Sequence, residues 1–411
     1  MSLKLTDRRL LTILLIVFVQ MVGAAMVLPI LPLFAQREFN ISPTIITLLI
    51  SAFFAAQFIG GPYLGRLSDQ YGRLPVLIVS QLGTAISFVM LGMADSVWML
   101  FAARILDGIT GGNIIVAQAY ITDVTPREQR TAALGYIFAV FGLGFIFGPA
   151  LGGILSAAFG PRIPFLIAAA AALLAVIITW LVLDETVTDE QKVTSRAHRG
   201  SLALRQVVGN TPLLIVLAIA FVGQFALGLL QGTFALYSEA VLFAGESDET
   251  VNLGVGLLLT VVGVGQLFTQ TLLLKRLLAR FGDLWLVYAG SIIRSGGLLI
   301  FAIFTTPLLG AFGSLFFAIG MGLLMPPLQS LTTQAVPDVL RGGALGVHQS
   351  SVSLATIVST AVAGAIFAIN PTTPYWVGAF LSLVALIPAL LLPRQLRLQR
   401  AALEGSYSAT D

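Results

Sequence analysis

The sequence predicts an all-α membrane protein with twelve transmembrane helices in two pseudo-symmetric six-helix bundles. Three observations support this fold: the composition, a series of long apolar runs, and short motifs that recur between the halves of the chain. Of the 411 residues, 57% are hydrophobic and only 10% are charged, whereas soluble domains carry about 25% charged residues. So few charges could not cover a water-soluble fold of this length, and we expect lipid to surround most of the chain.

Twelve apolar runs are long enough to cross a bilayer, because an α-helix needs roughly 20 apolar residues to span the hydrocarbon core. They lie at residues 10–35, 43–64, 75–94, 98–121, 131–156, 163–183, 212–238, 251–274, 285–305, 308–333, 343–368 and 375–393. The first run has no small-residue cleavage site, so we expect it to remain as a span.

Basic residues mark one side of the membrane. Counted from a cytoplasmic N-terminus, the inner gaps between runs hold 18 of the 22 Lys and Arg residues. The outer gaps hold Arg37 and Arg162, and the runs themselves hold Arg104 and Arg294. Cytoplasmic segments of membrane proteins are enriched in Lys and Arg. We therefore expect a multi-pass protein of the cell (inner) membrane with both termini in the cytoplasm.

A polar linker separates the two predicted bundles. We expect an N-terminal bundle at 1–183, a cytoplasmic linker at 184–211, a C-terminal bundle at 212–393 and a cytoplasmic tail at 394–411. The motif Arg66-Leu67 with Gly72 recurs 210 residues later as Arg276-Leu277 with Gly282. Secondary transporters are often built from such repeats, with a substrate site where the halves meet.

Several function classes lack the residues that they require. The chain has no cysteine and two histidines, which argues against a metal centre or a cysteine nucleophile. There is no GxxxxGK[ST] motif for ATP, and no basic cluster on an otherwise soluble face. We expect no enzyme activity, no cofactor, no metal and no nucleic-acid partner, and we expect a monomer.

The segment after the second run, GRLSDQYGRLP, combines glycines that permit a tight turn with a carboxylate, Asp69, that a helix N-terminus would attract. It resembles the signature loop of the major facilitator superfamily, with matching residues at Gly65, Asp69, Gly72, Arg73 and Pro75. The resemblance implies a conformational latch between the halves, in which Asp123 and Arg130 also take part. The alternative is a solvated loop that only follows the positive-inside rule.

The fifth run carries a row of small residues with a proline. It looks like the GxxxGPxxGG motif of the antiporter branch of that superfamily, with matches at Gly144, Gly148, Pro149, Gly152 and Gly153. Small residues four apart let membrane helices approach closely, and the eighth run offers a small face in Gly256, Gly263 and Gly265. Ordinary helix packing is the alternative reading, so the motif indicates antiport only through the resemblance.

The first half of the chain also resembles bacterial tetracycline and multidrug/proton antiporters at residues 29–32 and 106–112. Three positions depart from the tetracycline antiporters: Gln20 and Arg294 replace carboxylates, and Gln266 replaces a histidine. These departures argue against tetracycline as the substrate and against the proton route of those proteins.

Charges inside the membrane are costly and are functional candidates by default. Asp107 is the one acid deep within a run, and Arg104 precedes it by one helical turn, so the two side chains can pair. Competition between burial and this pairing could let Asp107 bind and release a proton, whereas a permanent ion pair would only brace the first half. Arg294 has no acid in its own run, so its partner could be Asp107, helix carbonyls or a substrate anion; otherwise it reaches an interface.

The resemblance places runs one, four, seven and ten around the cavity. It thereby implies substrate contacts for Gln20, Asn113, Gln231, Phe234, Tyr237 and Gln329, with Arg294 in the same cavity. Amide and aromatic groups suit amphiphilic substrates.

The leading hypothesis is a secondary transporter that exports an amphiphilic, drug-like small molecule in exchange for protons by alternating access. One alternative is a proton symporter or uniporter of a nutrient, organic anion or lipid. Another is a non-transporting membrane receptor or scaffold.

Overall fold

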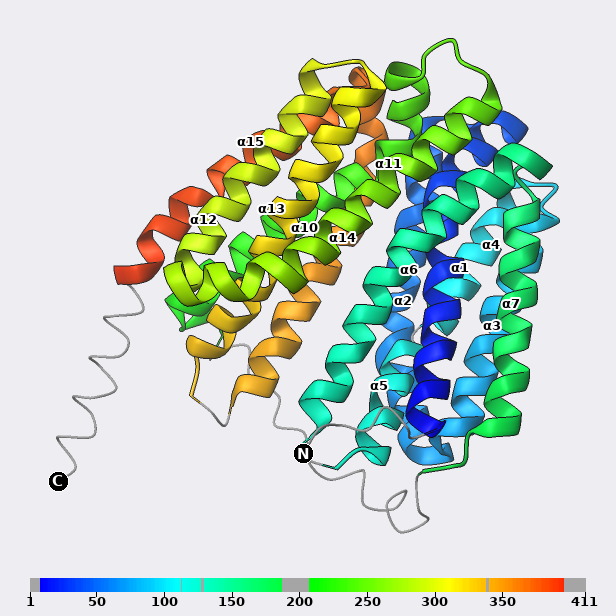
Figure 1. Cartoon of the computed structure of the whole chain (residues 1–411), viewed down its shortest axis with the longest axis horizontal. Coiled ribbons are helices and arrows are strands. Elements are labelled where there is room, and N and C mark those ends of the chain that lie inside the picture. Colours follow the sequence, from blue (N-terminus) through cyan, green and yellow to red (C-terminus); the bar gives the residue numbers. More distant parts are fainter. Residues whose placement is uncertain (1–7, 112, 127–128, 187–206, 338–339, 395–411) are drawn as a thin grey trace. The chain divides into compact units, whose positions relative to one another are not determined.

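A computed structural model describes residues 8–111, 113–126, 129–186, 207–337 and 340–394. Within these ranges every regular element is helical (Figure 1). The first half of the chain forms seven of the helices. They are α1 (Arg8–Phe39), α2 (Pro43–Tyr71), α3 (Arg73–Gly92), α4 (Val97–Thr110), α5 (Asn113–Val124), α6 (Arg130–Phe159) and α7 (Ile163–Val182).

The second half has the same character but includes two short π-helical segments. Its elements are α10 (Thr211–Tyr237), η2 (Ser238–Leu242), α11 (Asp248–Phe268), η3 (Thr269–Leu273), α12 (Leu274–Ile303), α13 (Pro307–Gln334), α14 (Arg341–Ile369) and α15 (Thr373–Val384). The last apolar helical segment continues to Arg394.

In the described ranges, eleven helical segments are long and apolar enough to cross a membrane. One of them, Asp248–Ile303, has 56 residues, which is enough for two crossings. Gly282 interrupts it with a φ of 78°, a conformation that favours glycine. This segment therefore holds the eighth and ninth predicted spans, and the twelve-helix fold is confirmed.

The segment after the second span is more helical than its glycines predict. We expected a loop from Gly65, but α2 continues to Tyr71, so Gly65 and Asp69 lie within the helix. The turn is confined to Gly72, whose φ of 107° favours glycine. The expectation of an eleven-residue loop is wrong because a helix in water tolerates the polar residues that end an apolar run.

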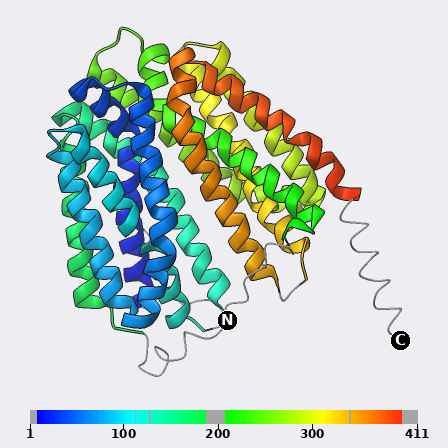
Figure 2. The ribbon, with the colours of Figure 1, turned by 180° about the vertical axis from the view of Figure 1, so that it is seen from behind.

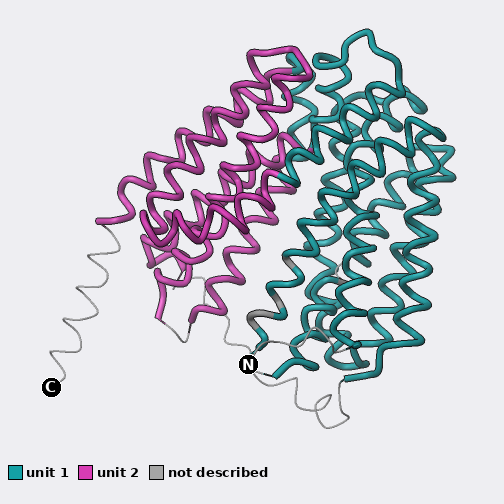
Figure 3. The backbone as a smooth tube through the Cα atoms, viewed as in Figure 1, with its two compact units in different colours: residues 1–198, 232–264, 360–371 teal, residues 199–231, 265–359, 372–411 magenta. Residues whose placement is uncertain are grey.

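By their contacts, the described residues divide into two compact units (Figure 3). The first unit contains residues 1–198, 232–264 and 360–371, and the second contains 199–231, 265–359 and 372–411. The boundary does not follow the sequence halves, since parts of α10, α11 and α14 pack with α1–α7. The division into an N-terminal and a C-terminal bundle stays a prediction.

Each unit has its own apolar interior. In the first unit, α1 packs against α6 and α7 (Figure 2), and its buried Leu10, Ile13 and Val17 meet Tyr120 of α5 and Ile137 of α6. In the second unit, α12 packs against α13 and α15. These packed helices hold the polar side chains described below in fixed positions.

Candidate functional site

Arg104 and Asp107 form a buried ion pair one turn apart on α4. The Arg104 Nη1 donates to the Asp107 Oδ2 at 2.9 Å, and the two side chains are 7% and 6% exposed. The guanidinium also lies over the ring of Phe53 on α2, with its Cζ 4.0 Å from the ring centroid. The pairing that the spacing allowed is therefore present, and an aromatic face stabilises the cation.

The ion pair faces a row of hydroxyl groups on α3. Thr84 and Ser87 lie within hydrogen-bonding reach of the Asp107 carboxylate, and Ser80 donates to the backbone oxygen of Thr110. Gly108 lets α4 approach α2 so closely that a methyl group there would meet the backbone of Phe53. The carboxylate is thus held among donors from α3 and α4, an arrangement that fits both a proton site and a structural brace.

Arg294 is fully buried in the middle of α12. Its Nη1 donates to the backbone oxygen of Gly223 on α10 at 2.9 Å, and its Nη2 donates to the Ser382 Oγ on α15 at 2.9 Å. Of the partners that the sequence allowed for Arg294, the structure shows a helix carbonyl and not an acid. Because none of the side chain is exposed, it does not reach an interface.

The predicted cavity residues fall into both units. Gln20, Phe234 and Tyr237 belong to the first unit and are buried; the Nε2 of Gln20 has no hydrogen-bond partner in the described part of the chain. Gln231 and Gln329 belong to the second unit.

Within that second unit, Gln231 is half-buried, Gln329 is exposed and Arg294 is buried. Asn113 begins α5, but its side chain lies outside the described part. A shared cavity for these residues stays a prediction.

The residues of the predicted latch meet at the turn between α2 and α3. Arg73 forms an ion pair with Asp69 and another with Asp123 of α5, in which its Nε lies 3.0 Å from Oδ2. Arg130 instead donates to the backbone oxygen of Thr125 at 3.2 Å. The turn is thus a charge-paired junction of α2, α3 and α5 within the first unit.

Glu185 is a part of this junction that the sequence reasoning missed. Its carboxylate accepts from the backbone N–H groups of Arg73 at 2.8 Å and Leu74 at 3.0 Å, so it caps the N-terminus of α3. The neighbours of Glu185 bind other helices: Asp184 pairs with Arg9 of α1 at 2.6 Å, and Thr186 donates to Asp123 at 3.1 Å. A carboxylate shortly after the end of a span was the available signal, since helix N-termini attract negative charge.

The glycine row on α6 uses two faces of the helix. Methyl groups at Gly144 and Gly148 would collide with Met21 and Ala25 of α1, and one at Gly152 would lie in a tight contact 3.1 Å from the backbone oxygen of Met26. Those glycines therefore allow close packing against α1.

A second face of α6, about 100° around its axis from the first, meets α11. A methyl group at Gly153 would lie 2.7 Å from the backbone oxygen of Asn252, and one at Gly256 would lie 2.5 Å from the backbone oxygen of Pro149. Thr260 of α11 donates to the Ile146 backbone oxygen at 3.2 Å. Gly263 lies on this face of α11, but Gly265 contacts α13 instead.

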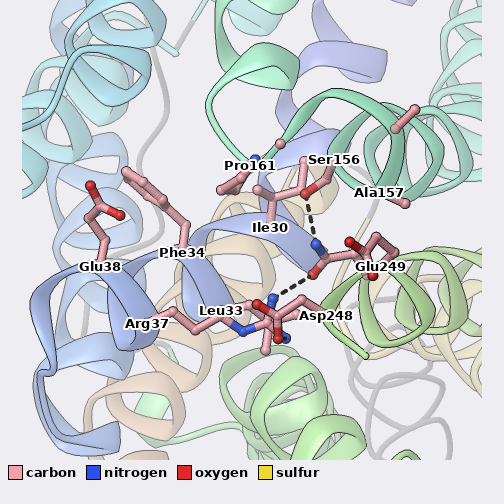
Figure 4. Close-up of a pocket in the computed structure, with 13 residues that line it drawn as sticks. Ile30, Leu33, Phe34, Arg37, Glu38, Ser156, Ala157, Pro161, Asp248 and Glu249 are labelled. Atoms are coloured by element: carbon pink, nitrogen blue, oxygen red, sulfur yellow. Dashed lines mark hydrogen bonds and ion pairs between the residues drawn. The ribbon is translucent and has the colours of Figure 1, made fainter. Parts of the chain in front are cut away.

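A polar cavity of about 430 Å³ lies beside Arg37 at the C-terminal end of α1 (Figure 4). The Arg37 Nε donates to Glu239 of η2 at 2.8 Å, and its Nη1 donates to Asn252 of α11 at 3.2 Å. Its Nη2 lies 3.2 Å from the Asp248 Oδ1. We call Arg37, Glu239, Asp248 and Asn252 the Arg37 cluster.

The sequence predicted Arg37 in an outer gap, Asp248 in a loop or at the end of a run, and Glu239 at the water-accessible outer end of the seventh run. It did not predict that the three side chains meet. One feature of the sequence could have singled out Arg37 and Arg162, because the outer gaps contain no other basic residue. Each of these two arginines has an acidic partner: Arg162 pairs with Glu38 at 2.6 Å.

The long apolar helices, with an ion pair and an arginine buried among them, define a polytopic membrane protein. The Major Facilitator Superfamily model matches residues 13–247 and 246–405. The chain belongs to this superfamily, whose members are transporters.

The relatives of the chain include drug-resistance proteins. The chain is 31% identical over 393 residues to the class C tetracycline resistance protein of Escherichia coli, covering 94% of this chain and 97% of the relative. It is 27% identical over 378 residues to multidrug resistance protein 2 of Bacillus subtilis, covering 90% and 91%. A solved D-xylose-proton symporter superposes with a TM-score of 0.75 at 17% identity, covering 93% and 96%, and shows the shared fold.

Proposed function

We propose that the protein exports amphiphilic small molecules from the cytoplasm in exchange for protons, by alternating access. The observation that carries this proposal is the buried Arg104–Asp107 pair. Asp107 is the acid that burial and hydrogen bonding isolate from water inside a span, and its cation partner lies on the same helix. The names of the relatives support export of drug-like compounds.

The proposed proton step is an exchange of partners at Asp107. With Arg104 engaged, the carboxylate is stabilised in its charged form; when the helices around it move and the pair separates, a buried carboxylate is stabilised by binding a proton. Transport would then couple proton binding to the movement of α2, α3 and α4. We also propose that the protein lies in the inner membrane of the cell, with both termini in the cytoplasm.

The test is uptake into proteoliposomes across an imposed pH gradient, with ethidium as an amphiphilic probe and tetracycline in parallel. We expect Asp107→Asn to lower gradient-driven ethidium uptake by about tenfold or more, since removing a proton-transfer group typically costs at least that much. Exchange of ethidium without a gradient should continue. Full gradient-driven uptake with substrate-linked proton movement in Asp107→Asn would refute the coupling role.

Two further variants separate coupling from bracing. Asp95→Asn removes an exposed acid between α3 and α4 and should leave uptake unchanged. If the pair is only a brace, removing both charges with Arg104→Met and Asp107→Asn should restore gradient-driven uptake, because no buried charge is then left unpaired. We expect this double variant to remain uncoupled.

Symport or uniport of a nutrient, organic anion or lipid is the weaker candidate. Its motivation was Arg294 as a site for a substrate anion, but α10, α12 and α15 enclose this side chain and satisfy two of its nitrogens. Measurements of cellular accumulation distinguish the two directions: an exporter lowers the ethidium content of energised cells.

A further inference from the structure

A segment between the eighth and ninth predicted spans carries the second copy of the motif that recurs in the two halves of the chain. At the offset of 210 residues, the copies read GRLSDQYGRLP at residues 65–75 and KRLLARFGDLW at residues 275–285. The second copy has Ala279 where the first has Asp69, and Asp283 where the first has Arg73. The ion pair of Asp69 with Arg73 therefore has no counterpart in the second copy.

The second copy has gained positive charge and an aromatic ring. Lys275, Arg280 and Trp285 stand where the first copy has a glycine, a glutamine and a proline, and Arg276 keeps the arginine of the first copy. Three cations thus lie within six residues, shortly before a tryptophan. We call residues 274–285 the basic segment.

The basic segment is amphipathic. It is helical from Leu274, where α12 begins, to the turn at Gly282, whose φ is 78°. Successive residues of an α-helix are separated by about 100° around its axis, so the three cations fall within an arc of about 140°, and Leu278 and Phe281 lie outside this arc. Cations on one side and apolar side chains on the other are typical of a helix that lies at a membrane surface.

The three cations of the basic segment are exposed, and none of the ion pairs among the described residues includes them. Five arginines elsewhere in the described ranges do pair with acids. The nearest acid in sequence, Asp283, is turned towards α13, where its Oδ2 accepts from Ser330 at 3.2 Å and from Gln334 at 2.9 Å. The positive charge of the basic segment is therefore available to a further partner.

The apolar side of the basic segment is also exposed in part. Phe281 and Trp285 stack on each other across Gly282, with their ring centroids 4.4 Å apart, and both rings are exposed, as is Leu278. The Arg280 Cζ lies 5.4 Å from the centroid of the Phe281 ring. Tryptophan is enriched at the boundary between lipid headgroups and acyl chains. The basic segment therefore presents cations and exposed aromatic rings next to each other.

The place of the basic segment in the chain brings it to a membrane surface. It interrupts the apolar helical segment Asp248–Ile303, whose 56 residues are enough for two crossings. The chain leaves the membrane before the basic segment and enters it again afterwards, so the segment borders the lipid headgroups. A phospholipid with a negative headgroup matches both of its sides, because the phosphate can meet the cations while the acyl chains cover the exposed rings. A soluble anion would match the cations alone.

We propose that the basic segment is a binding site for an anionic phospholipid. Lys275, Arg276 and Arg280 hold the headgroup, and the stacked rings of Phe281 and Trp285 contact the acyl chains next to it. The lipid neutralises this turn, as acidic side chains do in the first copy of the motif. The topology proposed above places the lipid in the cytoplasmic leaflet, but its binding requires neither that topology nor transport.

Trp285 can report on its own lipid neighbours. The chain has four tryptophans, so replacing Trp98, Trp180 and Trp376 by phenylalanine leaves Trp285 as the single fluorophore. The full-length protein is reconstituted into mixtures of phosphatidylcholine and phosphatidylglycerol in which one of the two lipids carries brominated acyl chains, which quench tryptophan on contact. The quenching gives the ratio of the binding constants of the two lipids beside Trp285.

We expect this ratio to favour phosphatidylglycerol by about tenfold or more, because each cation near an anionic surface strengthens binding by a factor of about five. Arg276→Gln should lower the ratio by a factor of about two to five, whereas Arg276→Lys, which keeps the charge, should retain most of the preference. The triple variant with Lys275→Gln, Arg276→Gln and Arg280→Gln should bind the two lipids almost equally.

The chain offers a matched control for the reporter and another for the charge. Trp376 of α15 is 47% exposed, against 45% for Trp285, and residues 342–393 around it contain no Lys or Arg. As the single tryptophan, Trp376 should show no preference between the two lipids. Arg66→Gln removes the exposed arginine at the equivalent position of the first copy and should leave the ratio at Trp285 unchanged.

Equal binding of the two lipids beside Trp285 would overturn the proposal, and so would an unchanged ratio in the triple variant. The same preference at Trp376, or an equal loss from Arg66→Gln and Arg276→Gln, would also contradict it, since the effect would then come from the charge of the whole protein. If inorganic phosphate at constant ionic strength abolishes the preference, the site binds a free anion and not a lipid. The vesicles contain no transport substrate and no pH gradient, so each result is independent of the proposed export.

Discussion

At the scale of single residues, the two buried arginines, Arg104 and Arg294, have different kinds of hydrogen-bond partner. Arg104 has a carboxylate partner, whereas the two terminal nitrogens of Arg294 donate to a backbone oxygen and a serine hydroxyl. A hydrogen bond to a charged donor is worth more than one between neutral groups. Ser382 should therefore matter more to stability than other serines between α12 and α15.

We predict that Ser382→Ala lowers the free energy of unfolding by about 1–2 kcal/mol, because it leaves a buried guanidinium nitrogen without an acceptor. Ser295→Ala is the control: Ser295 is also buried between α12 and α15, but it donates to a neutral backbone oxygen, that of Ala379, at 3.0 Å. It should cost only about 0.5 kcal/mol. Unfolding in detergent measures both, and equal losses would contradict this account of Arg294.

At the scale of elements, the turn between α2 and α3 combines a glycine in a backbone conformation that other residues rarely adopt with a carboxylate cap. Gly72 has a φ of 107°, and a methyl group on it would collide with the Glu185 carboxylate that caps α3. Gly160, between α6 and α7, has a φ of 90° and nothing within 4 Å of such a methyl group. A substitution at Gly160 therefore measures the cost of the backbone conformation alone, and one at Gly72 measures that cost together with the collision.

We predict that Gly160→Ala costs about 1 kcal/mol of stability from the backbone conformation alone, and that Gly72→Ala costs clearly more. Removing the carboxylate with Glu185→Ala should itself cost about 1 kcal/mol as a lost cap, but it should also relieve part of the Gly72→Ala penalty. The two effects in the double variant should therefore not add. Additive losses in thermal unfolding would show that Glu185 does not occupy this space in solution.

At the scale of the whole molecule, the two compact units and the distribution of charge describe different properties of the chain. The units describe which helices pack together, while the basic residues predict which loops face the cytoplasm. Exposed Asp95 and Glu246 lie in gaps that the charge count places outside, and exposed Gln70 lies near the turn that it places inside.

We predict that a membrane-impermeant maleimide labels Asp95→Cys and Glu246→Cys in intact cells, and labels Gln70→Cys only after permeabilisation. The physical reason is the positive-inside rule, under which short basic loops remain in the cytoplasm. The native chain without cysteines supplies the background measurement. The reverse pattern would invert the topology and with it the direction of proposed export, but not the contacts of the Arg37 cluster.

The fold was largely predictable because the length of an apolar run is a local property. The predicted second span ended at residue 64, but α2 ends at Tyr71, since hydropathy reports the edge of the bilayer and not the end of the helix. The Arg104–Asp107 pair was predictable because its members lie one turn apart. Arg37 and Glu239 meet only through tertiary packing, and Arg294 binds a backbone oxygen that has no sequence signal.

The neighbouring glycines at positions 152 and 153 belong to different interfaces, one with α1 and the other with α11. Successive residues of an α-helix are separated by about 100° around its axis. A single-residue insertion earlier in α6 would therefore turn both glycine faces away from their partners together, whereas most single substitutions would disturb only one. Homologous chains should accordingly vary in the side chains of this helix long before they vary in its length, and gaps in their alignments should fall outside residues 144–153.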